Sequence, residues 1–228
     1  MLLTKVYDSL AKQEGDPPAS TLLMGWDSIP IRAEKSVYDL AIACREHPQL
    51  VAYLLHANSE QIVRQLENGQ PPDGVEADAW SELSSRFTRH LEQFGHIVFQ
   101  LDFSEDLPLD HPAPVLETVK MYLRGEGVNP HERQQSSQDR RIQTAQSVLA
   151  RLKGFRRWAF KLALKAGQTM AEVREDALAD IGLAYPTLRA MLRELGGRFV
   201  TAGIITQAED IFWLQKEEID TMLAARDG

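Results

Sequence analysis

Cysteine is nearly absent from this chain. Cys44 is the only one in 228 residues, so no disulfide can form within the chain and no cluster of thiolates can bind a metal. A reducing cytoplasm is therefore the expected compartment. Long apolar runs are also missing, because no stretch approaches the roughly 20 residues that span a bilayer. The opening residues, MLLTKVYDSL, carry charges and lack the apolar segment of a signal peptide.

Positive charge is in the minority. The chain has 25 lysines and arginines against 33 aspartates and glutamates, which gives a formal net charge of −8. Bulk attraction to nucleic acid or to an anionic membrane is not expected of such a chain, and we predict neither as a partner. The hydrophobic content of 43% is that of an ordinary globular protein.

The common catalytic motifs are missing too. The sequence contains no GxGxxG, no Walker loop, no HExxH and no GxSxG. No two of its six histidines have the i, i+4 spacing that would present both to a metal from one helix. The sequence therefore predicts no catalytic residue and no metal site.

Helical periodicity is present almost throughout. For example, it sets Leu40 and Cys44 on the apolar face of one helix, and Trp80, Leu83 and Phe87 on that of another. It predicts an all-α protein, an irregular array of helices with at most one short strand pair, formed by residues 1–228 as a single domain. The one candidate strand is IVFQLDF, residues 97–103. Capping-box patterns at Ser136 and Thr169 predict two helix starts, and Pro186 is expected to kink or split the helical segment around it.

Basic residues are concentrated between positions 133 and 165, where Asp139 is the only acidic residue. One interpretation is a surface that faces nucleic acid or phosphate, and a variant is a surface that docks on an acidic partner domain. The other interpretation is a solvated helix face with its aromatic side chains in the core. We favour the last, because Phe155 and Trp158 share an apolar helix face with Leu162.

The C-terminal third carries a family resemblance. Its features are Arg174-Glu175 inside a long helix, Leu195-Gly196, Gly203, the run Glu209-Asp210-Ile211-Phe212 with Leu214, and the pair Glu217-Glu218. This pattern resembles the helical segment of the phosphoenolpyruvate-utilising enzymes, the superfamily of pyruvate phosphate dikinase and phosphoenolpyruvate synthase. Within it, the chain is most similar in style to the rifampicin phosphotransferases.

The N-terminal part agrees in the same order. LLMGWDSIPIRAEKSVYDLA resembles the entry segment of the family, and LEQFGHIVFQLDF resembles its Gly-His turn. Two positions depart from the family pattern: Ile97 and Gln100 stand where the family usually has an arginine and an acid. Any substrate contact made there in relatives is in doubt for this chain.

The resemblance implies a division of labour between domains. In such enzymes an ATP-grasp domain phosphorylates a histidine on a swivelling domain, and that histidine passes the phosphate to an acceptor held by the helical domain. This chain is then the helical acceptor-binding or linker domain, without catalysis of its own; ATP and Mg²⁺ belong to the full-length enzyme, and the two other domains are its partners. The alternative is a stand-alone helical module that binds proteins and no small molecule. The candidate acceptor-binding residues, chosen near loops and helix ends, are Met24, Trp26, Tyr38, Phe94, His96 and Phe99.

The run EDIFWL, residues 209–214, could form either a carboxylate site with an apolar floor or a structural segment that closes the core. We interpret it as structural. Glu209 and Asp210 are expected to cap a following helix, while Phe212 and Leu214 are expected to plug the helix array. For a fully buried aromatic residue, Phe212→Ala should cost about 3–5 kcal/mol.

Overall fold

The computed structural model describes residues 2–98, 102 and 104–226. Across that part of the chain every regular element is helical, which confirms the all-α prediction. Residues 97, 98 and 102 of the expected strand are not in strand conformation, and residues 99–101 and 103 lie outside the described residues. Among the described residues, no helix is long and apolar enough to cross a bilayer.

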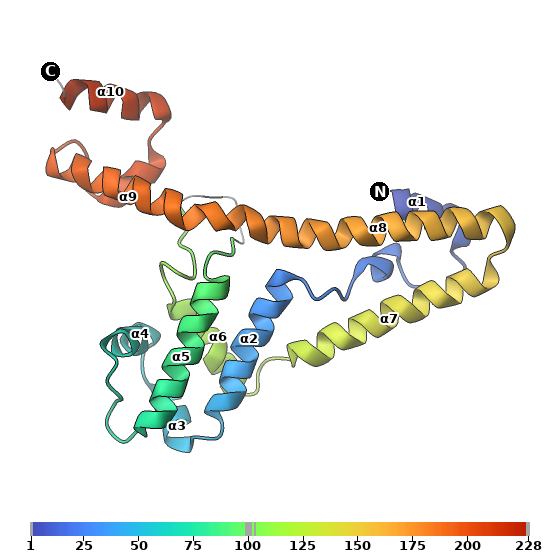
Figure 1. Cartoon of the computed structure of the whole chain (residues 1–228), viewed down its shortest axis with the longest axis horizontal. Helices are drawn as coiled ribbons and strands as arrows, with labels where there is room; N and C mark the ends of the chain where they lie inside the picture. The colour runs from blue at the N-terminus through green and yellow to red at the C-terminus, as the bar shows by residue number, and fades with distance from the viewer. Residues whose placement is uncertain (1, 99–101, 103, 227–228) are drawn as a thin grey trace.

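The longest feature of the fold is a helical rod in which helices follow one another end to end (Figure 1). It consists of α8 (Gly154–Ile181), the 3₁₀ turn η3 (Gly182–Ala184) and α9 (Tyr185–Thr201). Pro186 lies in the first turn of α9, so the predicted split occurs just before it. Beyond α9 the chain folds back through η4 (Ala208–Trp213) and α10 (Lys216–Arg226).

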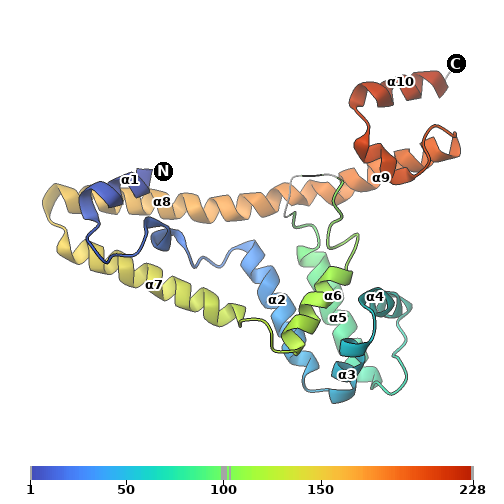
Figure 2. The same cartoon turned by 180° about the vertical axis from the view of Figure 1, so that it is seen from behind.

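One core lies under the first half of the rod. It is formed by α1 (Leu2–Val6), η1 (Tyr7–Ala11), η2 (Ala19–Leu23), α7 (Pro130–Arg151) and α8. Phe160 is fully buried and its ring centroid lies 6.2 Å from that of Tyr7. The side-by-side placement of α1 and α8 is visible in both views (Figures 1 and 2).

A second core lies below the middle of the rod (Figure 2). It joins α2 (Ile29–Cys44), α3 (Pro48–His56), α4 (Ser59–Asn68), α5 (Ala77–Phe94) and α6 (Ala113–Leu123). Apolar residues of α2 and α5 predicted from periodicity, such as Leu40 and Trp80, are buried in it. That residues 1–228 form a single domain stays a prediction.

Two predicted helix starts are wrong. Ser136 lies inside α7, which begins at Pro130 behind an Asn129 cap whose side chain accepts a hydrogen bond from the His131 amide at 3.0 Å. Thr169 lies inside α8, which is continuous from Gly154 to Ile181. A capping-box pattern is only four residues long, so it recurs by chance inside helices whose neighbours keep them intact.

The predicted burial of the aromatic face of α8 is also wrong. Phe155, Trp158 and Leu162 share a face as expected, but they are 73%, 60% and 56% exposed. The core takes a different face of the same helix, which carries Phe160 and Leu164. Periodicity places residues on a common face, but it does not say which of two apolar faces has a partner.

The plug at residues 209–214 is formed by a different residue from the ones predicted. Ile211 is 2% exposed, whereas Phe212 and Leu214 are half-buried and Trp213 is 77% exposed. The expected cap of a following helix is wrong, because the Gln215 amide before α10 donates to Glu218 at 2.8 Å. Asp210 instead caps the turn to which it belongs, since its Oδ2 accepts a hydrogen bond from the Gln207 amide at 3.0 Å at the start of η4. The carboxylate is therefore part of the scaffold.

Candidate functional site

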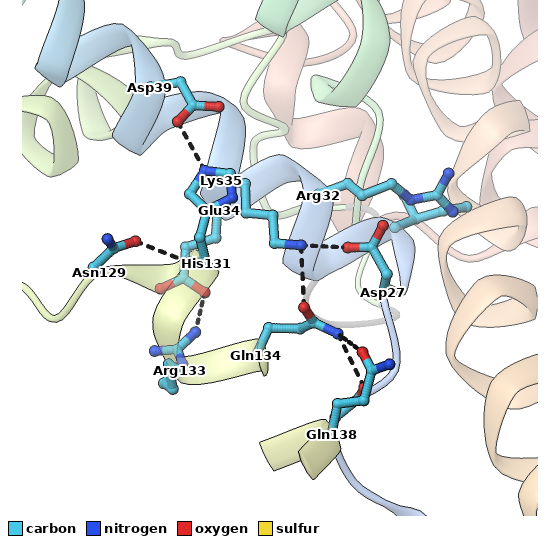
Figure 3. A network of polar contacts seen from close by, with 12 residues as sticks. Asp27, Arg32, Glu34, Lys35, Asp39, Asn129, His131, Arg133, Gln134 and Gln138 are labelled. Atoms are coloured by element: carbon cyan, nitrogen blue, oxygen red, sulfur yellow. Dashed lines mark hydrogen bonds and ion pairs between the residues drawn. The ribbon is translucent and has the colours of Figure 1, made fainter. Parts of the chain in front are cut away.

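A network of polar side chains lies where α2 meets the start of α7 (Figure 3). Pro30 and Pro130 occupy the first turns of the two helices, where the missing proline N–H leaves no hydrogen bond unmade. The first turns of α7 lie beside the middle of α2, where His131 and Gln134 contact Asp39 and Lys35. The polar residues of both helices face each other across this junction.

Lys35 is the central cation of the junction. Its Nζ lies 2.7 Å from Asp27 Oδ1 and donates to Gln134 Oε1 at 3.4 Å, and its side chain is only 17% exposed. An amine held by two acceptors and shielded from water keeps a defined position. Lys35 thereby ties the loop before α2 to the first turns of α7.

His131 occupies the other edge of the junction. Its Nε2 lies 2.8 Å from Asp39 Oδ1 of α2, and its ring centroid lies 6.0 Å from that of Tyr38. The contact with Asp39 orients the imidazole. Tyr38 in turn packs edge-on against Tyr122 at 5.1 Å.

Glu34 anchors the base of the junction. It pairs with Arg133 of α7 and accepts a hydrogen bond from the Tyr122 hydroxyl at 3.0 Å. Burial, with the hydrogen bond to the Glu34 carboxylate, raises the pKa of Tyr122 to about 12. Tyr122 therefore stays protonated and acts as a donor at physiological pH.

The loop before α2 is bound closely to α7. Gln134 Nε2 donates to the Gly25 carbonyl at 3.1 Å, and Arg141 Nη1 donates to the Met24 carbonyl at 2.9 Å. The guanidinium of Arg141 also lies 3.5 Å from the ring centroid of Trp26. Burial lowers the pKa of Arg141, and the Glu172 charge acts in the opposite direction. The cation is therefore held by the aromatic ring and the carbonyl of this loop.

A cleft of about 810 Å³ opens along this face of α7. Its lining is polar and comes from α2 and α7: Lys35, His131, Glu132, Gln134, Gln135, Ser136, Asp139, Arg140 and Gln143. A second hollow of about 330 Å³ lies beside it and shares Lys35 and His131. The smaller hollow also contains Leu40 and Phe94, so the two together offer a ligand amides, hydroxyls, charges of both signs and some apolar surface.

This lining offers side chains that can bind and orient a ligand. In the part of the chain that the structure describes, no three His, Cys, Asp or Glu side chains are grouped so that they could hold a metal. The cleft offers cationic groups and amides that fit hydroxyl, carbonyl or anionic oxygens of a ligand. The expectation that this chain carries no metal site and no catalytic residue stays a prediction.

The structure separates the six residues proposed for acceptor binding. Met24 and Trp26 lie together under Arg141, and Met24 is 57% exposed. Tyr38 borders the cleft through its contact with His131. Phe94 is buried, with its ring 5.4 Å from that of His90, and lines the smaller hollow.

The two remaining residues of that set follow α5. The His96 carbonyl oxygen packs against Gly182 in the rod. A Cβ atom on Gly182 would lie 2.3 Å from that oxygen. Phe99 lies outside the described residues, as does Gln100 of the family comparison. That the six residues form a binding site stays a prediction.

The cleft residues were not predicted from the sequence. His131 reads as a polar loop residue, yet it belongs to the first turn of α7. A signal was present in the polar positions 131, 134, 135 and 138, whose spacings of three and four residues are those of one helix face. Nothing in that spacing says that the face is turned towards α2.

The basic series 133–165 does not form one surface. Arg133 pairs with Glu34, Arg141 is 7% exposed beside Trp26, and Arg151 pairs with Asp16 and donates to the Ala11 carbonyl at 2.6 Å. Arg141 and Arg151 are mostly covered and join segments inside the molecule, so the solvated-face interpretation is wrong for these two residues. Arg133 remains 47% exposed despite its pair with Glu34.

Comparison with known proteins places the chain. No curated protein matches it. The family described as the rifampicin phosphotransferase fourth domain matches residues 1–175, which include both cores, the cleft and most of α8. The two N-terminal motifs and Arg174-Glu175 lie within the matched residues, whereas the other C-terminal features lie beyond them. The chain therefore belongs to the rifampicin phosphotransferase fourth-domain family, among the phosphoenolpyruvate-utilising enzymes.

Proposed function

We propose that this chain is the helical domain that presents the acceptor in an ATP-dependent, phosphoenolpyruvate synthase-like phosphotransferase. The family assignment supports its being a domain of a phosphotransferase, and the 810 Å³ cleft between α2 and α7 supports the binding of an acceptor. Its volume is within the range of small-molecule sites. In this proposal the chain binds and orients the acceptor and does not transfer phosphate by itself.

The chemistry of the cleft suits a polyhydroxylated acceptor. Gln135, Arg140 and Gln143 offer donors and acceptors along one face of α7, and none of them is a nucleophile. Phosphoryl transfer depends mainly on the position of the acceptor hydroxyl relative to the phosphate. Side chains that fix that hydroxyl are therefore sufficient for the role.

The open and polar lining implies that another domain completes the site. Small-molecule sites are usually enclosed and largely apolar, so this cleft by itself should bind weakly. The proposed partners are the ATP-grasp and phosphohistidine domains of the full enzyme, which would also bind ATP and Mg²⁺. The proposed compartment is the cytoplasm, on the strength of the single cysteine.

Titration of the chain with rifampicin, the compound in the family name, tests the proposal. We expect saturable binding, seen as amide shifts of α2 and α7 in NMR spectra. Arg140→Ala should weaken it about tenfold, because it removes a charged donor from the cleft. Arg198→Ala is the matched control, since Arg198 is 62% exposed on α9 and should leave binding unchanged.

Binding that is equally insensitive to both substitutions would place the ligand elsewhere and contradict the proposal. Absence of binding to rifampicin and to other hydroxylated macrocycles would contradict it as well. The second candidate function, a protein-interaction module, would then be preferred. It is supported by the exposed aromatic side chains Phe155 and Trp158 on α8.

A further inference from the structure

The outer face of α8 carries an apolar stripe that no described part of the chain covers. Helices α1, α2 and α7 pack along the other sides of α8 (Figures 1 and 2). The stripe follows the helix from end to end in steps of three or four residues, with these members: Phe155, Trp158, Leu162, Ala166, Met170, Val173, Ala177 and Ile181.

All members of this stripe are exposed. The largest exposed fractions are 73% for Phe155, 64% for Met170 and 60% for Trp158. An apolar patch of this length on a protein surface marks an interaction site. The question is which partner fits it.

We propose that the partner is a second copy of this chain, whose α8 packs antiparallel on the stripe about a two-fold axis near residues 167 and 168. The side chains along the stripe match when the helix is reversed on itself. Phe155 then faces Ile181 of the second copy, and Leu162 faces Val173. A C₂ dimer needs this kind of self-complementary surface.

The sizes of the facing side chains alternate in the same register. Trp158, the largest residue of the stripe, faces Ala177, and Met170 faces Ala166. A large side chain opposite a small one lets two helices pack without voids or clashes. A parallel two-fold pair sets Trp158 against itself. Reversal about Leu162 would set Trp158 against Ala166, but it would leave the second half of the stripe without a partner.

Charge on α8 supports the same arrangement. The first half of the helix bears the bases Arg156, Arg157, Lys161 and Lys165 and no acid, whereas Glu172, Asp176 and Asp180 lie in the second half. Antiparallel pairing brings the basic half of each copy to the acidic half of the other. Parallel pairing would place the two basic halves side by side, and likewise the two acidic halves, so that like charges would repel each other.

One edge of the stripe provides specific pairs. Positions 161, 165, 172 and 176 are separated by four, seven and four residues, so they lie along one edge of the helix. In the proposed register Lys165 meets Glu172 of the second copy, and Lys161 meets Asp176. Asp176 also accepts the Ile29 amide at 3.2 Å and lies 3.8 Å from Arg32, both through Oδ1; its side chain is 39% exposed, which leaves Oδ2 for the second copy.

The oligomeric state of the chain tests the proposal. By light scattering after gel filtration we expect a mass of twice 25.7 kDa at concentrations of about 100 μM, in the range of weak dimers. Leu162→Glu combined with Val173→Glu should give the monomer mass. Val128→Glu is the matched control, because Val128 is 67% exposed before α7 and lies off the stripe.

Charge exchange tests the register. Lys165→Glu and Glu172→Lys should each raise the dimer dissociation constant about tenfold at low salt, since each creates two like-charge contacts per dimer. The double variant Lys165→Glu/Glu172→Lys should restore the original value. Failure of the double variant to recover would overturn the proposed register.

Spin labels test the direction. In a Cys44→Ala background, labels at Arg156→Cys should be about 35 Å apart in the antiparallel dimer, from 1.5 Å of rise per residue. Labels at Thr169→Cys should lie within roughly 15 Å, because the helix axes are 8–10 Å apart. Short distances at both positions would establish a parallel pair and overturn the proposal. A chain that stays monomeric would also overturn it and leave the stripe to a neighbouring domain.

Discussion

Arg189 Nε lies 2.7 Å from Asp110 Oδ2, although 79 positions separate the two residues. The arginine is 1% exposed, and its Nη2 also lies 2.6 Å from Asp106 Oδ1. Its guanidinium carbon is 4.8 Å from the ring centroid of Phe212. One buried cation therefore joins the loop before α6, the helix α9 and the turn η4.

Loss of this cation should loosen the C-terminal end of the rod. We expect Arg189→Met to reduce the free energy of opening of α9 by about 3 kcal/mol, because it removes the buried cation shared by Asp106 and Asp110 and leaves them only Arg193. Hydrogen exchange of the α9 amides measures that opening. Arg198→Met should change it by less than about 0.5 kcal/mol, since its pair with Glu194 is exposed. Equal effects of the two substitutions would contradict a special role for Arg189.

Acid should destabilise the core of α2–α6 through His90. Burial lowers the pKa of His90 from 6.5 to about 4. The folded state holds the imidazole neutral, so its contribution is complete above pH 6.5 and is lost as the pH falls to about 4. Two to three pKa units correspond to about 3 kcal/mol. Urea unfolding of His90→Gln at several pH values should show a flatter profile over this window, whereas the exposed His56→Gln should follow the unsubstituted protein.

A second acid-sensitive group is Asp110, which pairs with Arg189 and Arg193 of α9. Burial of the Asp110 carboxyl acts to raise its pKa, but the hydrogen bond from Arg189 and the charge of Arg193 outweigh it and lower the pKa overall. A lowered carboxyl pKa stabilises the folded state above the ordinary aspartate range and loses that effect as the pH falls through the folded value. Asp110→Asn should remove this part of the acid sensitivity, below the window of His90, in the same unfolding series.

Gly25 should tolerate no side chain. Its φ is +77°, and a Cβ there would lie 2.6 Å from the Ser137 carbonyl carbon and closer still to the Gln138 amide nitrogen. We expect Gly25→Ala to cost at least about 2 kcal/mol in thermal or urea unfolding, from the backbone strain and the displacement of α7. Gly69→Ala has a similar φ of +70° and open space around it, so it should cost only the strain, about 1 kcal/mol. A smaller loss for Gly25→Ala than for Gly69→Ala would show that the loop does not rest on α7.

The turn at residues 208–213 should depend on Ile211 more than on its aromatic neighbours. Ile211→Ala removes a side chain that is 2% exposed and should cost about 2–4 kcal/mol. Phe212→Ala should cost less than the 3–5 kcal/mol expected of a fully buried aromatic residue, because the ring is only half-buried. Trp213→Ala, at 77% exposure, should be near neutral. Unfolding curves of the three variants give the order, and a larger loss for Trp213→Ala would contradict it.

The helical class and the apolar faces of single helices could be predicted from the sequence. Spacings of three and four residues placed Leu40 and Cys44 of α2 and Trp80, Leu83 and Phe87 of α5 in a core, and all five are buried. Pro186 marked the break in the rod. These predictions succeed because periodicity and backbone geometry act within a few residues.

The cleft could not be predicted in the same way. Lys35 and Gln134 are 99 positions apart and meet only because α2 and α7 pack against each other. The sequence by itself determined which residues share a helix face, and therefore the all-α fold; its ordered motifs carried the resemblance to the family that matches residues 1–175. Only the tertiary structure decided which of those faces are covered, since burial depends on partners that are remote in the chain. That is why Phe160 is in the core, while Phe155 and Trp158, on the same helix, face the solvent.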